Sequence, residues 1–170
     1  MDSLPKSLTI HLYSFAFKHR GIPEPLVGSH LNGEGGGFVF DCRALPNPFW
    51  DERLRPFTGL EAPILEYMAA CPEAQAFAAQ AAAMVLEAAQ SYHAQEKPTL
   101  RVAFGCTGGR HRSVWQVERL REALEREGFR VTVAHLDIGH GLEGQAKMSG
   151  ERESPSYDQP GTGSADRKRR

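Results

Sequence analysis

The stretch LRVAFGCTGGRHRSVWQVERL, residues 100–120, sets the organisation of this chain. It opens with a short apolar run, Leu100 to Phe104, of the kind found in buried strands. A glycine-containing segment, residues 105–109, interrupts that run. Apolar residues then recur at helical spacing from Val114 onward. The pattern predicts a strand, a glycine loop and a helix.

The loop of this unit has the composition of an anion-binding site. Backbone N–H groups in a glycine-rich turn and in the first turn of a helix converge and attract negative charge. Three basic side chains follow the glycines, although the helix dipole disfavours cations at this end unless an anion is present. A Gly-Gly pair that served only as a tight turn would need no such cluster. The predicted ligand-binding residues of the loop are Cys106, Thr107, Gly108, Gly109, Arg110, His111, Arg112 and Ser113.

Composition places the chain among globular proteins. It has 170 residues, of which 41% are hydrophobic, and a formal net charge of −1. This length supports one domain with a hydrophobic core, and the near-neutral charge leaves nucleic-acid binding to a local patch. No segment approaches the length of a membrane-spanning helix. The first residues also lack the features of a signal peptide.

The three cysteines, Cys42, Cys71 and Cys106, form neither a paired framework nor a zinc-binding pattern. An odd number of cysteines without a secretory leader fits a reducing compartment. We therefore expect a cytoplasmic protein that has no membrane contact and needs no metal and no cofactor.

Periodicity predicts the remaining elements. Segments with the content of strands are residues 8–17, 38–42, 100–104 and 130–136. Alanine-rich helices are expected over 63–95, divided at Pro72. Residues 21–36 and 49–63 are expected to be loops, and the length of the second indicates a functional role.

These elements predict a single α/β domain over residues 1–143. The sheet should be mostly parallel, with about four strands and flanking helices. From residue 144 onward glycine, serine, glutamate and proline dominate, so a disordered tail is expected over 144–170.

Polar residues at other strand ends extend the predicted site. Lys18 follows the first strand, and Arg43 and Asn47 follow the second. Ligands of open parallel sheets bind outside the carboxyl ends of the strands. We therefore add Lys18, Arg43 and Asn47 to the predicted ligand-binding residues.

Cys106 and Arg112 also have the C-x5-R spacing of the phosphate loop in cysteine-dependent tyrosine phosphatases, which this segment resembles. In those enzymes a thiolate attacks phosphorus while the arginine binds the phosphate oxygens. Gly105 replaces the histidine that usually precedes the cysteine, and Asp41 or Asp51 could be the general acid. A phosphatase is one alternative, with Cys106 as its catalytic residue. Otherwise we expect no catalytic residue.

Four segments identify a family resemblance. They are FAFKHRGIP (15–23), FVFDCRALPNP (38–48), LRPFTGLEAP (54–63) and FGCTGGRHRSV (104–114). In this order and spacing they closely resemble the C-terminal domain of the RapZ (YvcJ-type) proteins. The resemblance extends through the predicted strand near His135 and covers most of the expected domain.

This resemblance implies a regulatory ligand-binding domain. In enterobacterial members the domain binds glucosamine-6-phosphate and small regulatory RNAs, and the whole protein adapts an RNA to a ribonuclease. Full-length members also carry an N-terminal P-loop domain. The present chain has no G-x-x-x-x-G-K-[ST] motif, so nucleotide hydrolysis is not expected. A homo-oligomer and a separate nucleotide-binding partner are both open.

RNA binding in the family uses a basic end directly after the last strand. Here residues 135–141 read HLDIGHG, and the basic run Arg167–Arg170 lies far beyond. Our leading hypothesis is therefore a non-catalytic domain that binds a phosphorylated small molecule, with an amino-sugar phosphate as the leading ligand. An RNA-binding adapter is the alternative.

Overall fold

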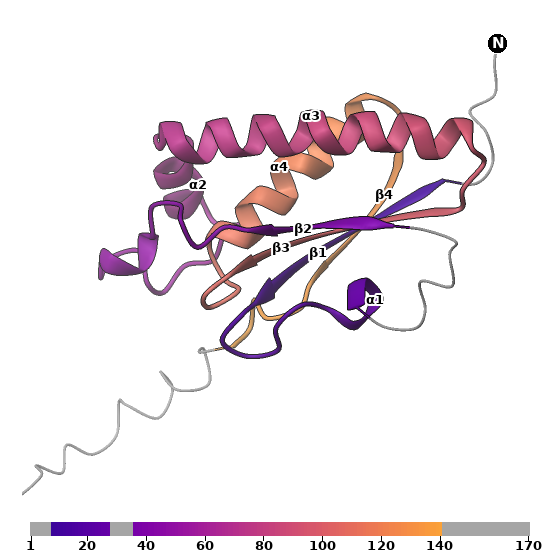
Figure 1. The fold of residues 1–170 in the computed structure, drawn as a ribbon. Coiled ribbons are helices and arrows are strands. Elements are labelled where there is room, and N and C mark those ends of the chain that lie inside the picture. The colour runs from indigo at the N-terminus through magenta and orange to yellow at the C-terminus, as the bar shows by residue number, and fades with distance from the viewer. Residues whose placement is uncertain (1–7, 28–35, 141–170) are drawn as a thin grey trace, which may run out of the picture.

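The computed structural model describes residues 8–27 and 36–140. Its strands are β1 (Thr9–Ala16), β2 (Gly37–Asp41), β3 (Thr99–Cys106) and β4 (Arg130–His135). They form one sheet in the order β2-β3-β1-β4, and every neighbouring pair is parallel (Figure 1). The predicted α/β fold with a four-stranded parallel sheet is confirmed.

The main helices are α2 (Ala62–Ala69), α3 (Pro72–Ala94) and α4 (Arg112–Arg126). Pro72 is the first residue of α3, as predicted, because a proline is tolerated where the helix has no N–H partner to lose.

Two short helical turns were not predicted. Helix α1 (Glu24–Val27) lies inside the segment 21–36, which was expected to be loop. A 3-10 turn, η2 (Pro48–Trp50), follows Asn47, whose side chain accepts the Phe49 N–H. Prolines in the first turn of each segment were read as breakers, although that is the helical position at which proline is tolerated.

The hydrophobic core lies between one face of the sheet and helices α3 and α4. Ile10, Leu12, Val102 and Phe104 alternate along the two central strands and are fully buried on this face. Figure 1 shows α3 and α4 on this side of the sheet and α1 on the other. The alternation expected of strands therefore selects the face that the helices cover.

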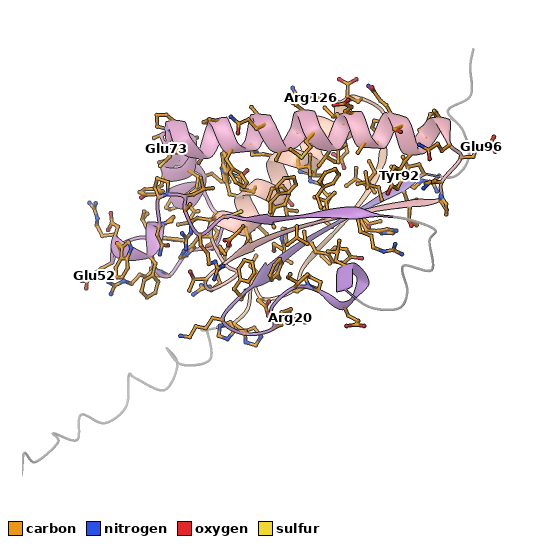
Figure 2. All side chains as sticks on the ribbon, viewed as in Figure 1. Arg20, Glu52, Glu73, Tyr92, Glu96 and Arg126 are labelled. Atoms are coloured by element: carbon orange, nitrogen blue, oxygen red, sulfur yellow. The ribbon has the colours of Figure 1, made fainter. Side chains whose placement is uncertain are left out.

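Parallel pairing brings all four carboxyl ends to one edge of the sheet. Strand β1 is central and pairs with both β3 and β4, so β3 and β4 are not neighbours. The segments after all four strands meet at this edge. In Figure 2, Glu52, which follows η2, lies at the opposite end of the molecule from Glu96, which follows α3.

Helix α4 carries ion pairs between residues three and four positions apart. Arg119 pairs with Glu122 at 2.6 Å, and Arg121 pairs with Glu125 at 2.7 Å. These pairs lie at helical spacing on the surface and need no functional explanation. In residues 8–27 and 36–140, no helix is both long and apolar enough to cross a membrane.

We predict that Leu12→Ala lowers the free energy of unfolding by about 2–5 kcal/mol, because it leaves a cavity in the hydrophobic core beside the central strand β1. Met84→Ala is the control, since Met84 lies on α3 and is 51% exposed; its effect should stay within about 0.5 kcal/mol. Urea denaturation measures both values. Equal losses in the two variants would contradict this placement of the core.

Candidate anion-binding site

The predicted loop joins the end of β3 to the start of α4. Gly109 has φ = 69°, a conformation that costs an L-residue free energy. A Cβ on Gly109 would also lie 2.8 Å from the Asp137 Cβ and 3.0 Å from the Ala16 Cβ. Glycine at this position therefore lets the loop turn and pack against the ends of β1 and β4.

The N–H groups of residues 107–114 are the main feature of the site. Within residues 8–27 and 36–140, no backbone carbonyl accepts a hydrogen bond from any of them. The next N–H along the chain, that of Trp115, does have a partner: it donates to the His111 carbonyl at 3.0 Å. Unbonded N–H donors at a helix N-terminus can bind an oxyanion.

Arg112 is buried beside this row, with 4% of the residue exposed. Its Nη1 donates to the Arg43 carbonyl at 2.9 Å and the Leu45 carbonyl at 3.0 Å. Its Nη2 reaches the Thr107 hydroxyl at 3.4 Å. The Nε is buried and has no acceptor among the described residues. Arg112 therefore has a structural role and keeps one donor unpaired.

Arg110 and His111 hold the segment before α2 against the loop. Arg110 Nη2 donates to the Pro56 carbonyl at 3.1 Å, and His111 Nε2 donates to the Phe57 carbonyl at 2.7 Å. The Gly59 N–H donates in return to the Arg110 carbonyl at 2.7 Å. The LRPFTG segment therefore packs directly on the predicted loop.

Burial is the main cause that lowers the pKa of His111. The hydrogen bond to Phe57 opposes this shift, and the positive charges of Arg110 and Arg112 add to it. His111 is consequently neutral at neutral pH. A neutral imidazole that donates to a carbonyl adds no positive charge to the site.

Cys106 and Ser113 lie at the base of the loop, where Sγ and Oγ are 3.1 Å apart. Cys106 is 2% exposed. A Cβ on Gly105 would lie 2.4 Å from the Phe15 ring and 2.5 Å from the Phe17 ring. This crowding explains why a glycine occupies the position at which the phosphatases have a histidine.

Neither candidate general acid is suited to donate a proton. Hydrogen bonds from Arg43 lower the pKa of Asp41, and hydrogen bonds from Arg53 lower the pKa of Asp51. Both carboxyl groups are therefore ionised at neutral pH, whereas a general acid must be protonated. This arrangement does not favour catalysis by Cys106.

The Arg43 side chain is engaged locally. It donates to Asp41 at 2.7 Å, and its guanidinium carbon lies 4.0 Å from the centre of the Phe17 ring. Its carbonyl, rather than its charge, contacts Arg112. Arg43 thus contacts the loop through its backbone, and its predicted contact with a ligand remains a prediction.

Lys18 contacts the loop through its backbone, whereas the Asn47 side chain contacts the turn η2. The Lys18 N–H donates to the Thr107 carbonyl at 3.2 Å, which places Lys18 beside the loop with an exposed residue surface. Asn47 accepts the Phe49 N–H at 3.3 Å and so begins η2. Their predicted contacts with a ligand remain predictions.

Asp137 follows the last strand and was not among the predicted ligand-binding residues, but it lies against the loop at Gly109. It is 1% exposed and accepts hydrogen bonds from the Ala16 N–H and Arg20 Nε, both at 2.9 Å. It also forms the surface against which Gly109 packs. The sequence signal was an acidic residue directly after a buried strand, but its pairing with Arg20 depends on the strand order.

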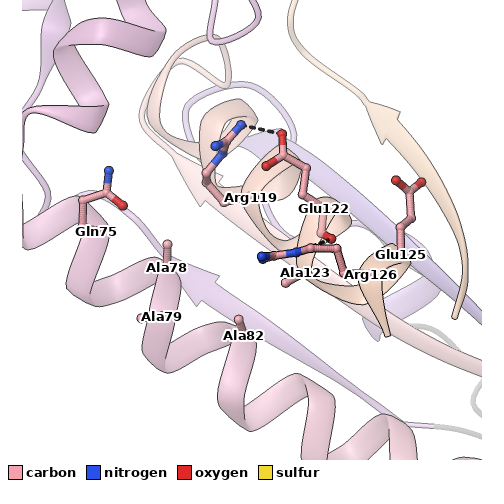
Figure 3. A pocket seen from close by; sticks show the side chains of 9 residues that line it. All are labelled: Gln75, Ala78, Ala79, Ala82, Arg119, Glu122, Ala123, Glu125 and Arg126. Carbon is pink, nitrogen blue, oxygen red and sulfur yellow. Dashed lines mark hydrogen bonds and ion pairs between the residues drawn. The ribbon is translucent and has the colours of Figure 1, made fainter. Parts of the chain in front are cut away.

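A hollow lies away from the loop, between α3 and α4 (Figure 3). It has a volume of about 730 Å³ and shares no residue with the loop. Four alanines from the two helices line it, together with Gln75, Arg119, Glu122, Glu125 and Arg126. Because Arg119 and Arg126 donate to acceptors on α4 itself, we place the candidate site at the loop.

Some predictions lie outside the described residues. The tail 144–170 and the basic run Arg167–Arg170 are among them. In the described ranges, no group of three or more His, Cys, Asp or Glu side chains could hold a metal ion.

Comparison with known proteins agrees with the motifs. The sequence model of the RapZ C-terminal domain matches residues 8–139. A nucleotide-binding protein of Corynebacterium jeikeium is 38% identical over 132 residues, which cover 78% of this chain and 42% of that protein. One from Laribacter hongkongensis is 38% identical over 134 residues, covering 79% and 44%. One from Frankia alni is 46% identical over 101 residues, covering 59% and 35%. The chain thus spans less than half the length of these relatives.

We predict that Gly109→Ala lowers the free energy of unfolding by at least about 1 kcal/mol, because an L-residue is strained at this positive φ. Gly108→Ala is the matched control, since a Cβ there meets nothing within 4 Å. Thermal unfolding of both variants measures the difference. A Gly109→Ala protein as stable as Gly108→Ala would show that the loop does not adopt this conformation.

We also predict that stability falls as the pH is lowered below about 6.5, the ordinary pKa of histidine. The pKa of His111 is lowered in the folded state, so the unfolded chain binds the proton first and acid favours unfolding. The stabilisation that comes from neutral His111 is fully present above the pKa of histidine in the unfolded chain. It is lost as the pH falls from that value through the lowered pKa of the folded protein. His111→Gln should flatten the dependence in urea titrations at several pH values. An unchanged slope would contradict the assignment.

Proposed function

Since this chain belongs to the RapZ C-terminal domain family, we propose that it is a regulatory domain that binds a phosphorylated small molecule at residues 106–113. One observation carries the proposal. The N–H groups of residues 107–114 have no acceptor in the described parts of the chain, and the buried Nε of Arg112 has none either. A buried donor without a partner, such as this Nε, is costly, and a phosphate would supply acceptors for it and for the N–H groups.

The electrostatics support a dianionic ligand. Arg112 contacts carbonyls rather than a carboxylate, and it lies in the first turn of α4, where the helix dipole also favours negative charge. In our proposal the amides at Gly108 and Gly109 hold the phosphate. Thr107 and Ser113 donate hydroxyls, and Arg112 provides the charge.

We further propose an amino-sugar phosphate, such as glucosamine-6-phosphate, as the ligand. Asp41 supports this choice because it pairs in register with Gly105, directly before the loop. Its carboxylate is ionised and its side chain is 46% exposed. It could therefore accept a hydrogen bond from the ammonium group of a sugar whose phosphate occupies the loop.

Two alternatives lead to different measurements. An RNA-binding adapter would show an affinity that falls steeply with salt concentration and would depend on the run Arg167–Arg170. A cysteine-dependent phosphatase would turn over a phosphomonoester and lose that activity in Cys106→Ser. The lowered pKa values of Asp41 and Asp51 weigh against the phosphatase.

We place this function in the cytoplasm, because the cysteines Cys42, Cys71 and Cys106 are all unpaired and a reducing compartment keeps them so. We expect no nucleotide hydrolysis by this domain. Assembly with further copies or with a nucleotide-binding partner remains open to test.

We predict that a phosphorylated sugar at 100 times its Kd stabilises the protein by roughly 2.7 kcal/mol. The measurement is thermal unfolding with inorganic phosphate, glucose 6-phosphate, glucosamine 6-phosphate and glucosamine. Phosphate-bearing compounds should raise the melting temperature, and glucosamine alone should not.

The matched variants are Arg112→Gln and Arg126→Gln, at the first and last positions of α4. The glutamine of the first variant could still donate to the carbonyls of Arg43 and Leu45 but lacks the charge. Its phosphate affinity should therefore fall at least about tenfold, since a charged hydrogen bond contributes roughly 1.5–3 kcal/mol. Arg126→Gln should bind as the wild type does. The proposal fails if no phosphorylated compound stabilises the wild type, or if both variants lose affinity equally.

A further inference from the structure

Three polar side chains form a hydrogen-bonded relay behind the candidate site. Ser14, near the end of β1, lies with its Oγ 2.8 Å from His135 Nδ1. His135, the last residue of β4, has its Nε2 3.2 Å from Glu118 Oε1 on α4. Arg121 donates to the other oxygen of Glu118 at 2.9 Å. The relay therefore links two strands to the helix that covers them.

One assignment of protons satisfies every member of this relay. Glu118 is ion-paired with Arg121 and can only accept, so His135 Nε2 carries a proton. In the neutral imidazole Nδ1 is then an acceptor, and the Ser14 hydroxyl donates to it. Ser14 is fully buried, so water cannot replace the imidazole as its partner.

Burial also excludes a hydrolytic role for these residues. Their types are those of a Ser-His-Glu triad, in which a serine attacks a bound substrate. Here Ser14 has no exposed surface, and His135 and Glu118 have side chains only 13% and 16% exposed. No substrate can reach the hydroxyl, so the relay must act through what it holds in place.

On one side, the relay lies next to the ends of β1 and β4, which contact the loop. Leu136 N–H donates to the Ser14 carbonyl at 2.9 Å. Ala16 lies two residues after Ser14, and Asp137 lies two residues after His135. The Ala16 N–H donates a hydrogen bond to Asp137, and both residues pack against Gly109.

On its other side the relay holds α4. Glu118 follows Arg112 by six positions, which is about 9 Å along the helix. The bond from His135 to Glu118 thus joins the surface behind the loop to the helix whose first turn supplies the N–H groups.

We infer that His135 is a positioning residue for the loop of residues 106–113. Through its hydrogen bonds to Ser14 and Glu118, it sets the position of the α4 N-terminus relative to the ends of β1 and β4. The expected effect of His135 on phosphate affinity rests on the proposed function. Its effect on loop geometry does not depend on a ligand, and the two can be measured separately.

The chain offers a matched control on the same two strands. His11 Nδ1 lies 2.7 Å from the Thr132 hydroxyl, so it also bridges β1 and β4. His11 alternates with Ile10 and Leu12 and therefore projects from the opposite face of the sheet, away from α4. His11→Leu removes a comparable hydrogen bond that has no connection to the loop.

The experiment compares His135→Leu, His135→Gln and His11→Leu. A glutamine in place of His135 could accept from Ser14 and donate to Glu118, whereas a leucine could do neither. In the ligand-free proteins, backbone amide NMR signals of residues 107–114 should shift in His135→Leu and stay near wild-type positions in the other two. In calorimetric titration with inorganic phosphate, His135→Leu should bind about tenfold more weakly, the lower limit for losing an outer-shell partner at metal sites.

Each other outcome has a separate meaning. Unchanged loop signals in His135→Leu, or equal shifts in His135→Gln or His11→Leu, would overturn the positioning role. Failure of the wild type to bind phosphate or any sugar phosphate would overturn the proposed function, while the NMR comparison would still decide the role of His135. If His135→Leu does not fold, Ser14→Ala removes only the donor hydroxyl and should produce shifts in the same loop signals.

Discussion

The buried guanidinium of Arg112 is the contact on which the arrangement of the site depends. Through the carbonyls of Arg43 and Leu45 it fastens the segment after β2 to the first turn of α4. A buried charge is costly unless its donors are paired, and these carbonyls satisfy only part of the group. The Nε remains without an acceptor in the described chain. One side chain thus holds the segment after β2 against α4 and keeps one donor unpaired.

Two of the basic residues in the loop bond to carbonyl groups of the protein itself. Arg110 and His111 donate to the carbonyls of Pro56 and Phe57 and so hold the LRPFTG segment in place. In the proposed site, binding would depend mainly on backbone N–H groups, which every residue type except proline carries. The basic run still matters, because it docks the surrounding segments on the loop without occupying those N–H groups.

Membership of the RapZ C-terminal domain family fixes the fold and the location of the loop. The relatives are named nucleotide-binding proteins, and this chain spans less than half of their length. Their activity as whole proteins therefore does not transfer to it directly. The loop, the strand ends around it and the relay at His135 all lie within the domain, so a ligand bound there would be a property of the domain alone.

The sequence by itself determined the four strands, the division of the helices at Pro72 and the position of the glycine loop, because these depend on local periodicity and on the special geometry of proline and glycine. It did not reveal α1, whose proline resembled a helix breaker. Only the tertiary structure decided that β1 separates β3 from β4. That order brings Asp137 to Ala16 and His135 to Ser14, across 121 positions of sequence in each case. Such contacts depend on which strands are neighbours in the sheet. Strand order is set by contacts between residues far apart in the sequence, so local sequence patterns do not reveal it.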